Sequence, residues 1–308
     1  MSVMGRSITN DVAPEIAAAA GGTVPPKRRR GGARSTGTGG TVLRYLCTAA
    51  IVLAALLPLA WMAISGFKSR TEVVTSPFQF FPEVWRPENY LEILRDPGFS
   101  RALLVSFGGA LLFAALSLTV NSMAAYAFER LDFAFRRTLW FLALMTMFIP
   151  QMAILLTSYL VVTQLGMLNT LAVLVIPGAT AGVHIFFIRQ FYLGIPTSIE
   201  EAALMDGASR WQIFTKIFLP MSRPVFVVVG ITSFLLFWNA YVWPIMTITD
   251  PSSGLTQIQQ YLAAFRSERG TEYGLLLAGS TLAALPVIVL FLVFQRYIIS
   301  GIRISGLK

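Results

Sequence analysis

Charged residues, cysteine and histidine are all scarce in this chain. Only 13% of the 308 residues are charged, whereas 55% are hydrophobic, and this composition is too apolar for an ordinary soluble domain. Cys47 is the single cysteine, so an intramolecular disulfide is excluded. His184 is the single histidine, and one histidine cannot form a metal site by itself. We therefore expect a membrane protein with no metal centre.

The motifs of several enzyme classes are also missing. The sequence has no G-x-x-x-x-G-K-[S/T] phosphate-binding loop, no H-E-x-x-H and no G-x-S-x-G. The first absence means that the chain has no ATPase site of its own. The other two disfavour a membrane-embedded metalloprotease or Ser/His hydrolase. We therefore expect a protein that is not an enzyme.

Long uncharged runs indicate several membrane spans. Four runs are each close to the ~20 apolar residues that a helix needs to cross a bilayer core. A longer stretch between Arg137 and Arg189 is interrupted only by His184, and it suits two crossings joined by a turn at 163–170. No run alternates as barrel strands do, so we predict an all-α membrane protein with six transmembrane helices. The predicted spans cover about residues 45–67, 102–126, 138–162, 171–189, 224–248 and 274–295.

The distribution of Lys and Arg predicts the orientation. With the N-terminus inside, the cytoplasmic segments hold 17 of these residues and the opposite face holds seven, which places both termini in the cytoplasm. The chain then divides into a disordered basic tail (1–41), a transmembrane domain (42–297) and a cytoplasmic C-terminal tail (298–308). No nucleic-acid-binding fold accompanies the basic cluster at 27–30, so we interpret it as a topology signal that also contacts anionic lipid.

The cytoplasmic connection between the fourth and fifth predicted spans is unusually polar. Ser198 and Glu201 have the spacing of a capping box, which predicts the start of a short helix. Gly207 predicts the end of that helix. The same capping-box spacing at Ser209 and Gln212 predicts a second helix.

The second helix of this connection is predicted to be amphipathic. Trp211, Phe214 and Phe218 fall on one face, and Pro220 is expected to end the helix. An amphipathic linker lying on the membrane surface would explain this aromatic face.

The first helix has the composition of a docking surface. Ala202 and Ala203 allow another surface to approach closely, and Glu201 and Asp206 offer carboxylates to basic groups on that surface. A simple membrane-surface linker does not explain two carboxylates beside small residues. We therefore interpret segment 196–220 as a loop that docks a cytoplasmic partner.

The same segment carries a pattern known from one family. The elements E-A-A, three residues, G, nine residues and I-x-L-P are filled by Glu201, Ala202, Ala203, Gly207, Ile217, Leu219 and Pro220. This pattern resembles the signature loop of the permease subunits of bacterial ATP-driven (ABC) importers. The run 206–208, Asp-Gly-Ala, is similar to the carbohydrate branch of that family, of maltose type. The resemblance covers about residues 42–305, and only the ending at 303–308 departs from the usual family pattern.

The resemblance implies a division of labour between subunits. A six-helix subunit would pair with a second permease to form the pathway, two copies of a cytoplasmic ATPase would bind below, and an extracytoplasmic solute-binding protein would deliver the substrate. That substrate would be a carbohydrate or a related polyol compound such as a glycerol phosphate ester. No cofactor would bind the chain directly, and the partner subunits would hydrolyse ATP. The ATPase-coupling loop would comprise Glu200, Glu201, Ala202, Ala203, Asp206, Gly207, Ala208, Ile217, Leu219 and Pro220.

A self-sufficient secondary transporter or channel is the alternative function. Such a protein would normally need intramembrane acids or bases for ion coupling. Apart from Arg189 at the boundary of its span, the predicted spans hold none beyond His184, so the alternative is disfavoured.

Several residues of the predicted spans are candidates for lining a pathway. They are Asn121, Gln151, Ser158, His184, Trp238, Asn239 and Tyr241. A polar side chain at membrane depth usually faces protein or water, but interhelical hydrogen bonds would explain the polar candidates equally well. Likewise, the aromatic candidates suit either stacking on a sugar or an aromatic belt at the outer interface. Both interpretations stay open at this point.

Overall fold

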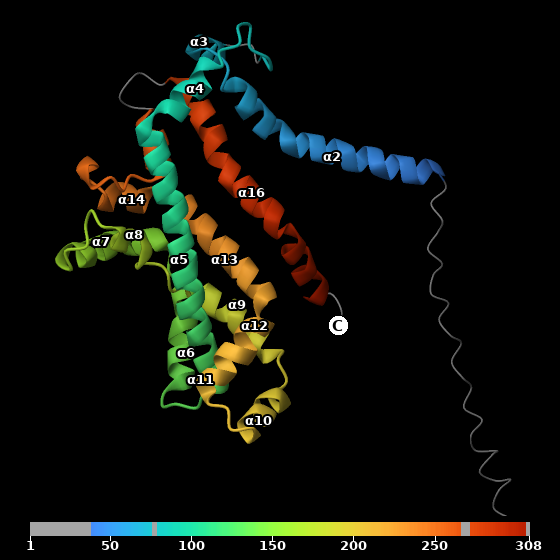
Figure 1. Ribbon diagram of the computed structural model, residues 1–308, viewed down its shortest axis with the longest axis vertical. Helices are drawn as coiled ribbons and strands as arrows, with labels where there is room; N and C mark the ends of the chain where they lie inside the picture. The colour runs from blue at the N-terminus through green and yellow to red at the C-terminus, as the bar shows by residue number, and fades with distance from the viewer. Residues whose placement is uncertain (1–37, 76–78, 266–271, 306–308) are drawn as a thin grey trace, which may run out of the picture. The chain divides into compact units, whose positions relative to one another are not determined.

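The computed structural model describes residues 38–75, 79–265 and 272–305, and every regular element in these ranges is helical (Figure 1). Residues 1–55 and 56–308 form two separate units. The described part of the first unit is the beginning of helix α2 (Thr38–Ser65). Almost all of the predicted tail 1–41 lies outside the described residues, so its disorder stays a prediction.

Three helices are long and apolar enough to cross a membrane. They are α2, α5 (Pro97–Arg130) and α16 (Tyr273–Ser305). These correspond to the predicted spans at 45–67, 102–126 and 274–295. Helix α16 continues beyond 297 through most of the segment that was expected to form the C-terminal tail.

The other three predicted spans are broken rather than continuous helices. Span 138–162 consists of α6 (Arg136–Met145), η1 (Thr146–Phe148), η2 (Gln151–Ile154) and α7 (Leu155–Gln164), with a bend of 100° between its two halves. Span 171–189 consists of α8 (Leu171–Val175) and α9 (Gly182–Leu193). Span 224–248 consists of α13 (Arg223–Trp238) and α14 (Val242–Thr247).

Proline and glycine account for two of these breaks. Pro150 lies between the two halves of the first broken span, where its missing N–H removes a helical hydrogen bond. Pro177 precedes Gly178, whose φ of +87° is a left-handed conformation that favours glycine. Counting each of two sharply bent helix pairs as one span gives at most five candidate crossings among the described residues. Six crossings therefore stays a prediction.

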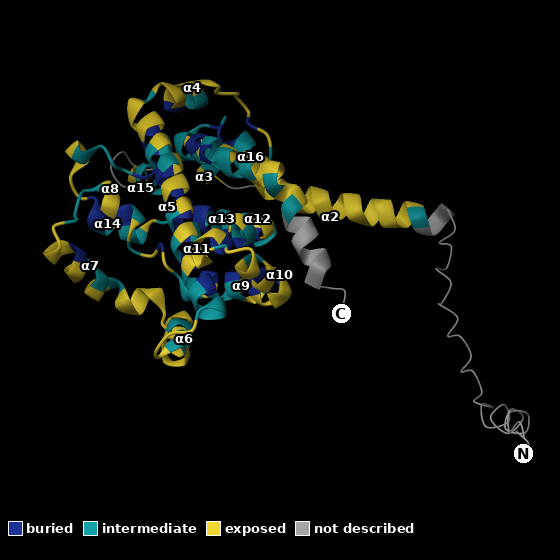
Figure 2. Cartoon of the chain, turned by 60° about the horizontal axis from the view of Figure 1, so that its bottom comes forward, coloured by how far each residue is buried: buried dark blue, intermediate teal, exposed yellow. Residues whose placement is uncertain are grey.

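Helix α5 is the central element of the second unit. It packs against α13 and α9, and buried residues gather along these contacts (Figure 2). At Gly109 the helices approach so closely that a Cβ atom would collide with the ring of Phe237 on α13. Because lipid tails are as apolar as leucine, such close packing, rather than exclusion of water, holds membrane helices together.

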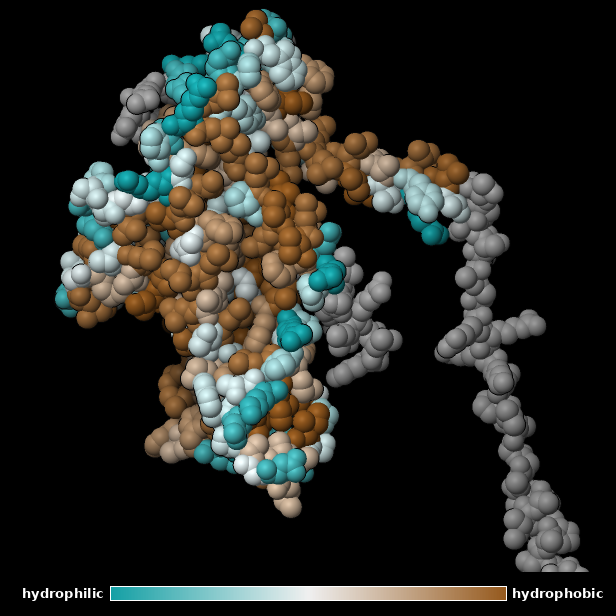
Figure 3. Space-filling model, in the orientation of Figure 1, coloured by the Kyte–Doolittle hydropathy of each residue, from teal (hydrophilic) through white to brown (hydrophobic). Residues whose placement is uncertain are grey.

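The two ends of this unit are more polar than its middle. Figure 3 shows hydrophobic side chains over the middle of the helical body, with hydrophilic side chains near the end that carries α4 (Glu88–Arg95) and near the end that carries α10 (Thr197–Met205). The end with α4 also holds α3 (Arg70–Val74), η4 (Pro251–Ser253) and α15 (Ile258–Ala264). A hydrophobic band between two polar ends is the distribution expected of a membrane-spanning body.

A capping box at Ser69 organises the polar end around α3. The N–H groups of Ser69 and Glu83 donate to the Glu72 carboxylate at 2.7 and 2.8 Å. Burial by itself would raise the pKa of Glu72, but hydrogen bonds from Ser69, Glu83 and Val84 outweigh it and lower this pKa to about 2. The ionised carboxylate therefore holds the backbone at Glu83 and Val84 against α3.

Acid should loosen this end of the molecule. The pKa of Glu72 is lower in the fold than the value of about 4.3 expected for an unfolded chain. Its stabilisation is thus complete above about pH 4.3 and is lost as the pH falls toward about 2. Hydrogen exchange, corrected for its intrinsic pH dependence, should show α3 losing protection over that interval. A Glu72→Gln variant should be less protected at neutral pH and lose little more in acid, and equal pH profiles for both proteins would contradict the prediction.

Candidate functional site

Helix α10 begins and ends by different means. It begins after Pro196, whose side chain makes no cap hydrogen bond. Ser198 already lies inside the first turn, so the predicted capping box of Ser198 and Glu201 is wrong. The end at Gly207 is confirmed, because this glycine has a φ of +79°. The N–H of Ala208 donates to the carbonyl of Ala203 at 3.0 Å, and this six-to-one bond closes a Schellman motif.

The second helix of the loop contains a π-helical turn. The predicted capping box at its start is confirmed: the N–H of Gln212 donates to the Ser209 hydroxyl at 3.3 Å, and the N–H of Ser209 donates to Oε1 of Gln212 at 2.8 Å. The chain then forms α11 (Arg210–Ile213), the π-helix η3 (Phe214–Phe218) and α12 (Leu219–Met221). It ends one residue beyond Pro220 and bends by 80° into α13.

The aromatic face of this helix is divided. Phe214 and Phe218 are buried against Tyr126 of α5 and Tyr192 of α9. Trp211 is 60% exposed, although its ring centre lies 5.5 Å from that of Phe214. The predicted residues Ile217 and Leu219 are half-buried and pack against the same cluster. The loop is therefore held by apolar packing on one side only.

Successive glutamates of α10 differ in exposure. Glu200 is buried, with 7% of its surface exposed, whereas Glu201 is exposed. Asp206 and Ala202 are exposed as well. Ala203 and Ala208 are half-buried and pack on the loop's apolar cluster. Of the residues predicted for coupling, Glu201, Ala202 and Asp206 thus form an outward surface of α10.

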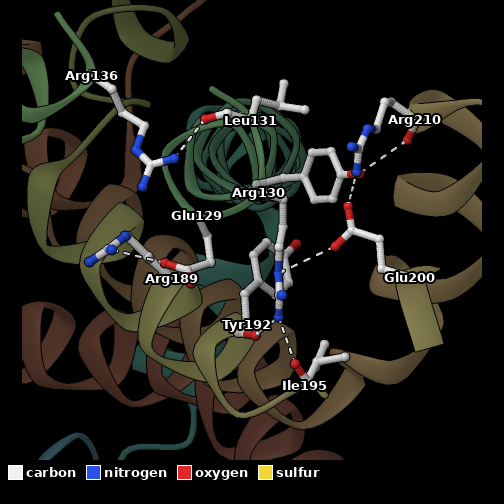
Figure 4. Close-up of polar contacts among 10 residues, drawn as sticks. Glu129, Arg130, Leu131, Arg136, Arg189, Tyr192, Ile195, Glu200 and Arg210 are labelled. Carbon is white, nitrogen blue, oxygen red and sulfur yellow. Dashed lines mark hydrogen bonds and ion pairs between the residues drawn. The ribbon is translucent and has the colours of Figure 1, made fainter. Parts of the chain in front are cut away.

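The buried carboxylate of Glu200 lies between two arginines (Figure 4). Its Oε2 lies 3.7 Å from Nε of Arg130, at the end of α5. Its Oε1 accepts a hydrogen bond from Arg210, at the start of α11. Sequence reasoning missed both arginines, because it treated them only as topology charges. Their positions near a span end and inside the loop were the available signal.

Arg130 also binds the end of α9. One of its terminal nitrogens, Nη2, donates to the carbonyls of Tyr192 and Ile195 at 2.7 and 2.6 Å. These carbonyls lie at the C-terminal end of a helix, where the helix dipole favours a cation. The guanidinium carbon also lies 5.2 Å from the centre of the Phe218 ring. A single side chain therefore joins α5 to α9, α10 and η3.

A second ion pair lies beside the first. Arg189 of α9 is 2.9 Å from the carboxylate of Glu129 on α5, and its guanidinium carbon is 4.4 Å from the centre of the Trp140 ring. Both charged side chains are mostly buried. This pair links α5 to α9, but it does not include the α10 loop.

Four of the pathway candidates line one cavity of about 680 Å³. They are Gln151, Ser158, Asn239 and Tyr241. The cavity lies beside α7, α13 and α14, and its wall includes the backbone break at 177–178. Irregular backbone at membrane depth is tolerated where it lines a cavity or is buried in protein. Every side chain that lines the cavity is uncharged.

The remaining candidates have other surroundings. Asn121 is fully buried, donates to the carbonyl of Ala179 at 2.9 Å and accepts from the N–H of Ala181 at 3.1 Å. It thus satisfies backbone groups that the break between α8 and α9 leaves free. Trp238 is 3% exposed and stacks on Phe234 of its own helix.

His184 belongs to a buried polar cluster that joins three helices. Its Nδ1 lies 3.3 Å from the hydroxyl of Ser117 on α5, and Ser233 of α13 donates to the same hydroxyl at 3.1 Å. Sequence reasoning missed these two serines, which look unremarkable in an apolar run. Asn121 and His184 therefore make the interhelical hydrogen bonds that were the alternative to a place in the pathway.

Comparison with known proteins identifies the family. Residues 117–304 match the model of the binding-protein-dependent transport system inner membrane component. The chain belongs to this family. The permease is 30% identical to an arabinooligosaccharides transport system permease protein of Halalkalibacterium halodurans, over 87% of this chain and 97% of that protein. It is also 30% identical to a diacetylchitobiose uptake system permease protein of Streptomyces coelicolor, over 80% of this chain and 82% of that protein.

A solved structure has the same fold as the permease. It is a bacterial ABC transporter involved in the import of the acidic polysaccharide alginate, with a TM-score of 0.71 over 86% of this chain and 98% of the matched chain, at 22% identity. Family membership and the several apolar helices make the protein a multi-pass component of the inner membrane. The permease's relatives are transport components rather than enzymes.

The different surroundings of Asn121 and Ser158 give a direct test. We expect Asn121→Ala to destabilise the permease by about 1–3 kcal/mol, because it leaves buried backbone groups at the break unpaired. Ser158→Ala removes a cavity hydroxyl and should change stability by less than about 0.5 kcal/mol. Thermal unfolding in detergent would measure both. Equal stability of the two variants would show that Asn121 does not hold the break.

Proposed function

We propose that this permease is one of two membrane subunits of an ATP-driven carbohydrate importer. Two copies of a cytoplasmic ATPase and an extracytoplasmic solute-binding protein complete the assembly. Family membership supports the partners, and the names of relatives support the substrate class. Besides the two systems above, a lactose transport system permease protein of Rhizobium radiobacter is 26% identical over 84% of this chain and 94% of that protein.

The ATPase docks on the outward surface of α10. The observation that carries this proposal is the different burial of adjacent glutamates: Glu200 is paired inside the permease, while Glu201 and Asp206 are exposed. Exposed carboxylates beside the small Ala202 suit a basic groove on a partner. The excess of Lys and Arg assigns this end of the molecule and both termini to the cytoplasm.

Reversal of one charge tests the docking surface. When the permease is purified with its ATPase, Glu201→Lys should reduce the bound ATPase about tenfold or more, because like charges would then face each other. Glu92→Lys is the matched control, since Glu92 is an exposed carboxylate on α4 at the opposite end. Full retention of the ATPase by Glu201→Lys, or uptake by the purified permease alone in liposomes, would argue against the proposal.

The cavity of Gln151, Ser158, Asn239 and Tyr241 forms this subunit's part of the pathway. None of these four side chains hydrogen-bonds another residue that the structure describes, although polar groups in a low-dielectric setting need partners. Water, substrate or the second permease would supply those partners. The uncharged lining suits a neutral sugar better than a phosphate ester.

Thiol labelling tests whether water reaches the cavity. In a Cys47→Ser background, a cysteine at Asn239 should react with a membrane-impermeant thiol reagent when the importer is in one of its two states. Leu104 is the matched control, because it is 73% exposed on α5 and sits in a predicted span without lining the cavity. A cysteine there should stay unlabelled. Labelling at Leu104 but not at Asn239 would contradict the assignment.

A further inference from the structure

The end of α5 and the α10 loop are joined through buried charge. Only 7% of the Arg130 side chain and 9% of the Glu200 side chain are exposed. Removing two charges from water is costly unless each finds a partner of good geometry. Here Arg130 donates to the two carbonyls at the end of α9, and its Nε lies 3.7 Å from Glu200, an ion pair that is too long for a hydrogen bond. Glu200 accepts a hydrogen bond from Arg210, its second partner. We call Arg130 and Glu200 the clamp.

The geometry of arginine makes the clamp stiff. The guanidinium is planar, and its donors point in fixed directions. Nη2 of Arg130 is committed to the carbonyls of Tyr192 and Ile195, while Nε faces Glu200. A displacement of α10 relative to α5 would break one of these contacts and leave a buried charge or carbonyl unpaired. Movement of one segment relative to the other is therefore costly.

Helix α5 connects the clamp to the cavity without a break. Phe113, which lines the cavity, and Arg130 belong to the same continuous helix. They are separated by about 25 Å at 1.5 Å per residue. The helices around the cavity, by contrast, are bent or interrupted. A push on α10 thus has an unbroken helix leading to one cavity wall, whereas other walls are formed by bent or interrupted helices.

We propose that Arg130 is the positioning residue that transmits movement of the α10 loop to the membrane helices. This inference rests on the proposed docking of an ATPase on α10, and it separates two tasks within that loop. Glu201 and its exposed neighbours bind the partner. Arg130 and Glu200 convert movement of the partner into movement of α5.

A purely structural role for the clamp is the competing explanation, and the neighbouring ion pair provides the control. Arg189 and Glu129 also join α5 to α9 through mostly buried charges and an aromatic ring, but within the described part of the chain neither makes an ion pair or hydrogen bond with segment 196–220. Loss of this pair should lower stability without separating ATP hydrolysis from transport. Loss of the clamp should separate them.

The test uses the complete importer in proteoliposomes, with its second permease, ATPase and binding protein. The transported probe is radiolabelled lactose, trehalose or diacetylchitobiose, chosen as the sugar that the binding protein binds in calorimetry. Arg130→Met and Glu200→Gln should keep the ATPase bound and hydrolysing ATP. The sugar taken up per ATP should fall about tenfold or more, which is within the usual range of coupling between sites. Arg130→Lys retains the positive charge but loses the planar guanidinium with its several donors. The sugar taken up per ATP should therefore be intermediate between the values for Arg130→Met and the unaltered importer.

The control and the remaining outcomes decide between the explanations. Arg189→Met should leave the sugar taken up per ATP close to that of the unaltered importer. A normal ratio in Arg130→Met and Glu200→Gln, an equal fall in Arg189→Met, or loss of the bound ATPase from both clamp variants would each overturn the inference. If Glu201→Lys retains the ATPase, the docking proposal itself has failed, and this is a separate measurement. Glu200→Gln keeps the hydrogen bonds from Arg130 to the carbonyls of Tyr192 and Ile195. It therefore still tests the inference if Arg130→Met does not fold.

Discussion

A buried carboxylate must be paired, and the arrangement of the α10 loop follows from how Glu200 meets that requirement. Arg130 reaches it from the end of α5, and Arg210 reaches it from the start of α11. The second helix of the loop has to fold back beside the first for Arg210 to arrive, and the left-handed Gly207 provides that turn. Phe214 and Phe218, in the second helix of the loop, are buried against α5 and α9 and hold the loop on the membrane helices.

The requirement that buried polar groups be paired also shapes the membrane helices. A break between α8 and α9 frees backbone groups that no water can satisfy inside a bilayer. Asn121 meets two of them from the neighbouring helix, while Ser117, Ser233 and His184 satisfy one another close by. The polar pathway candidates therefore fall into two groups: Asn121 and His184 satisfy the backbone or join helices, and Gln151, Ser158, Asn239 and Tyr241 line the cavity.

The sequence predicted the helical class, the three uninterrupted spans and the second capping box, because each depends on short-range pattern or on charge-free length. It also predicted the helix stop at Gly207, since a left-handed residue has a strong sequence preference. Pro150 and Pro177 mark two of the breaks, but Pro58 and Pro286 lie inside uninterrupted helices, so the effect of a proline depends on the helices packed around it. The different surroundings of Asn121 and Ser158 were not predictable, because both are polar residues in apolar runs and only their tertiary partners distinguish them.

The pair Glu200 and Glu201 shows most clearly where local pattern stops being informative. Neighbouring helical residues point about 100° apart, so one of the two had to face away from the other's partner. Glu200 is the one that turns inward, toward Arg130, whose Nη2 also donates to the carbonyl of Ile195 just before α10. A remote arginine thus pairs with one of two identical side chains, and the other is left available to a partner. The recognisable family motif begins at Glu201, yet its presentation depends on the residue before it and on a helix that ends about seventy positions earlier in the chain.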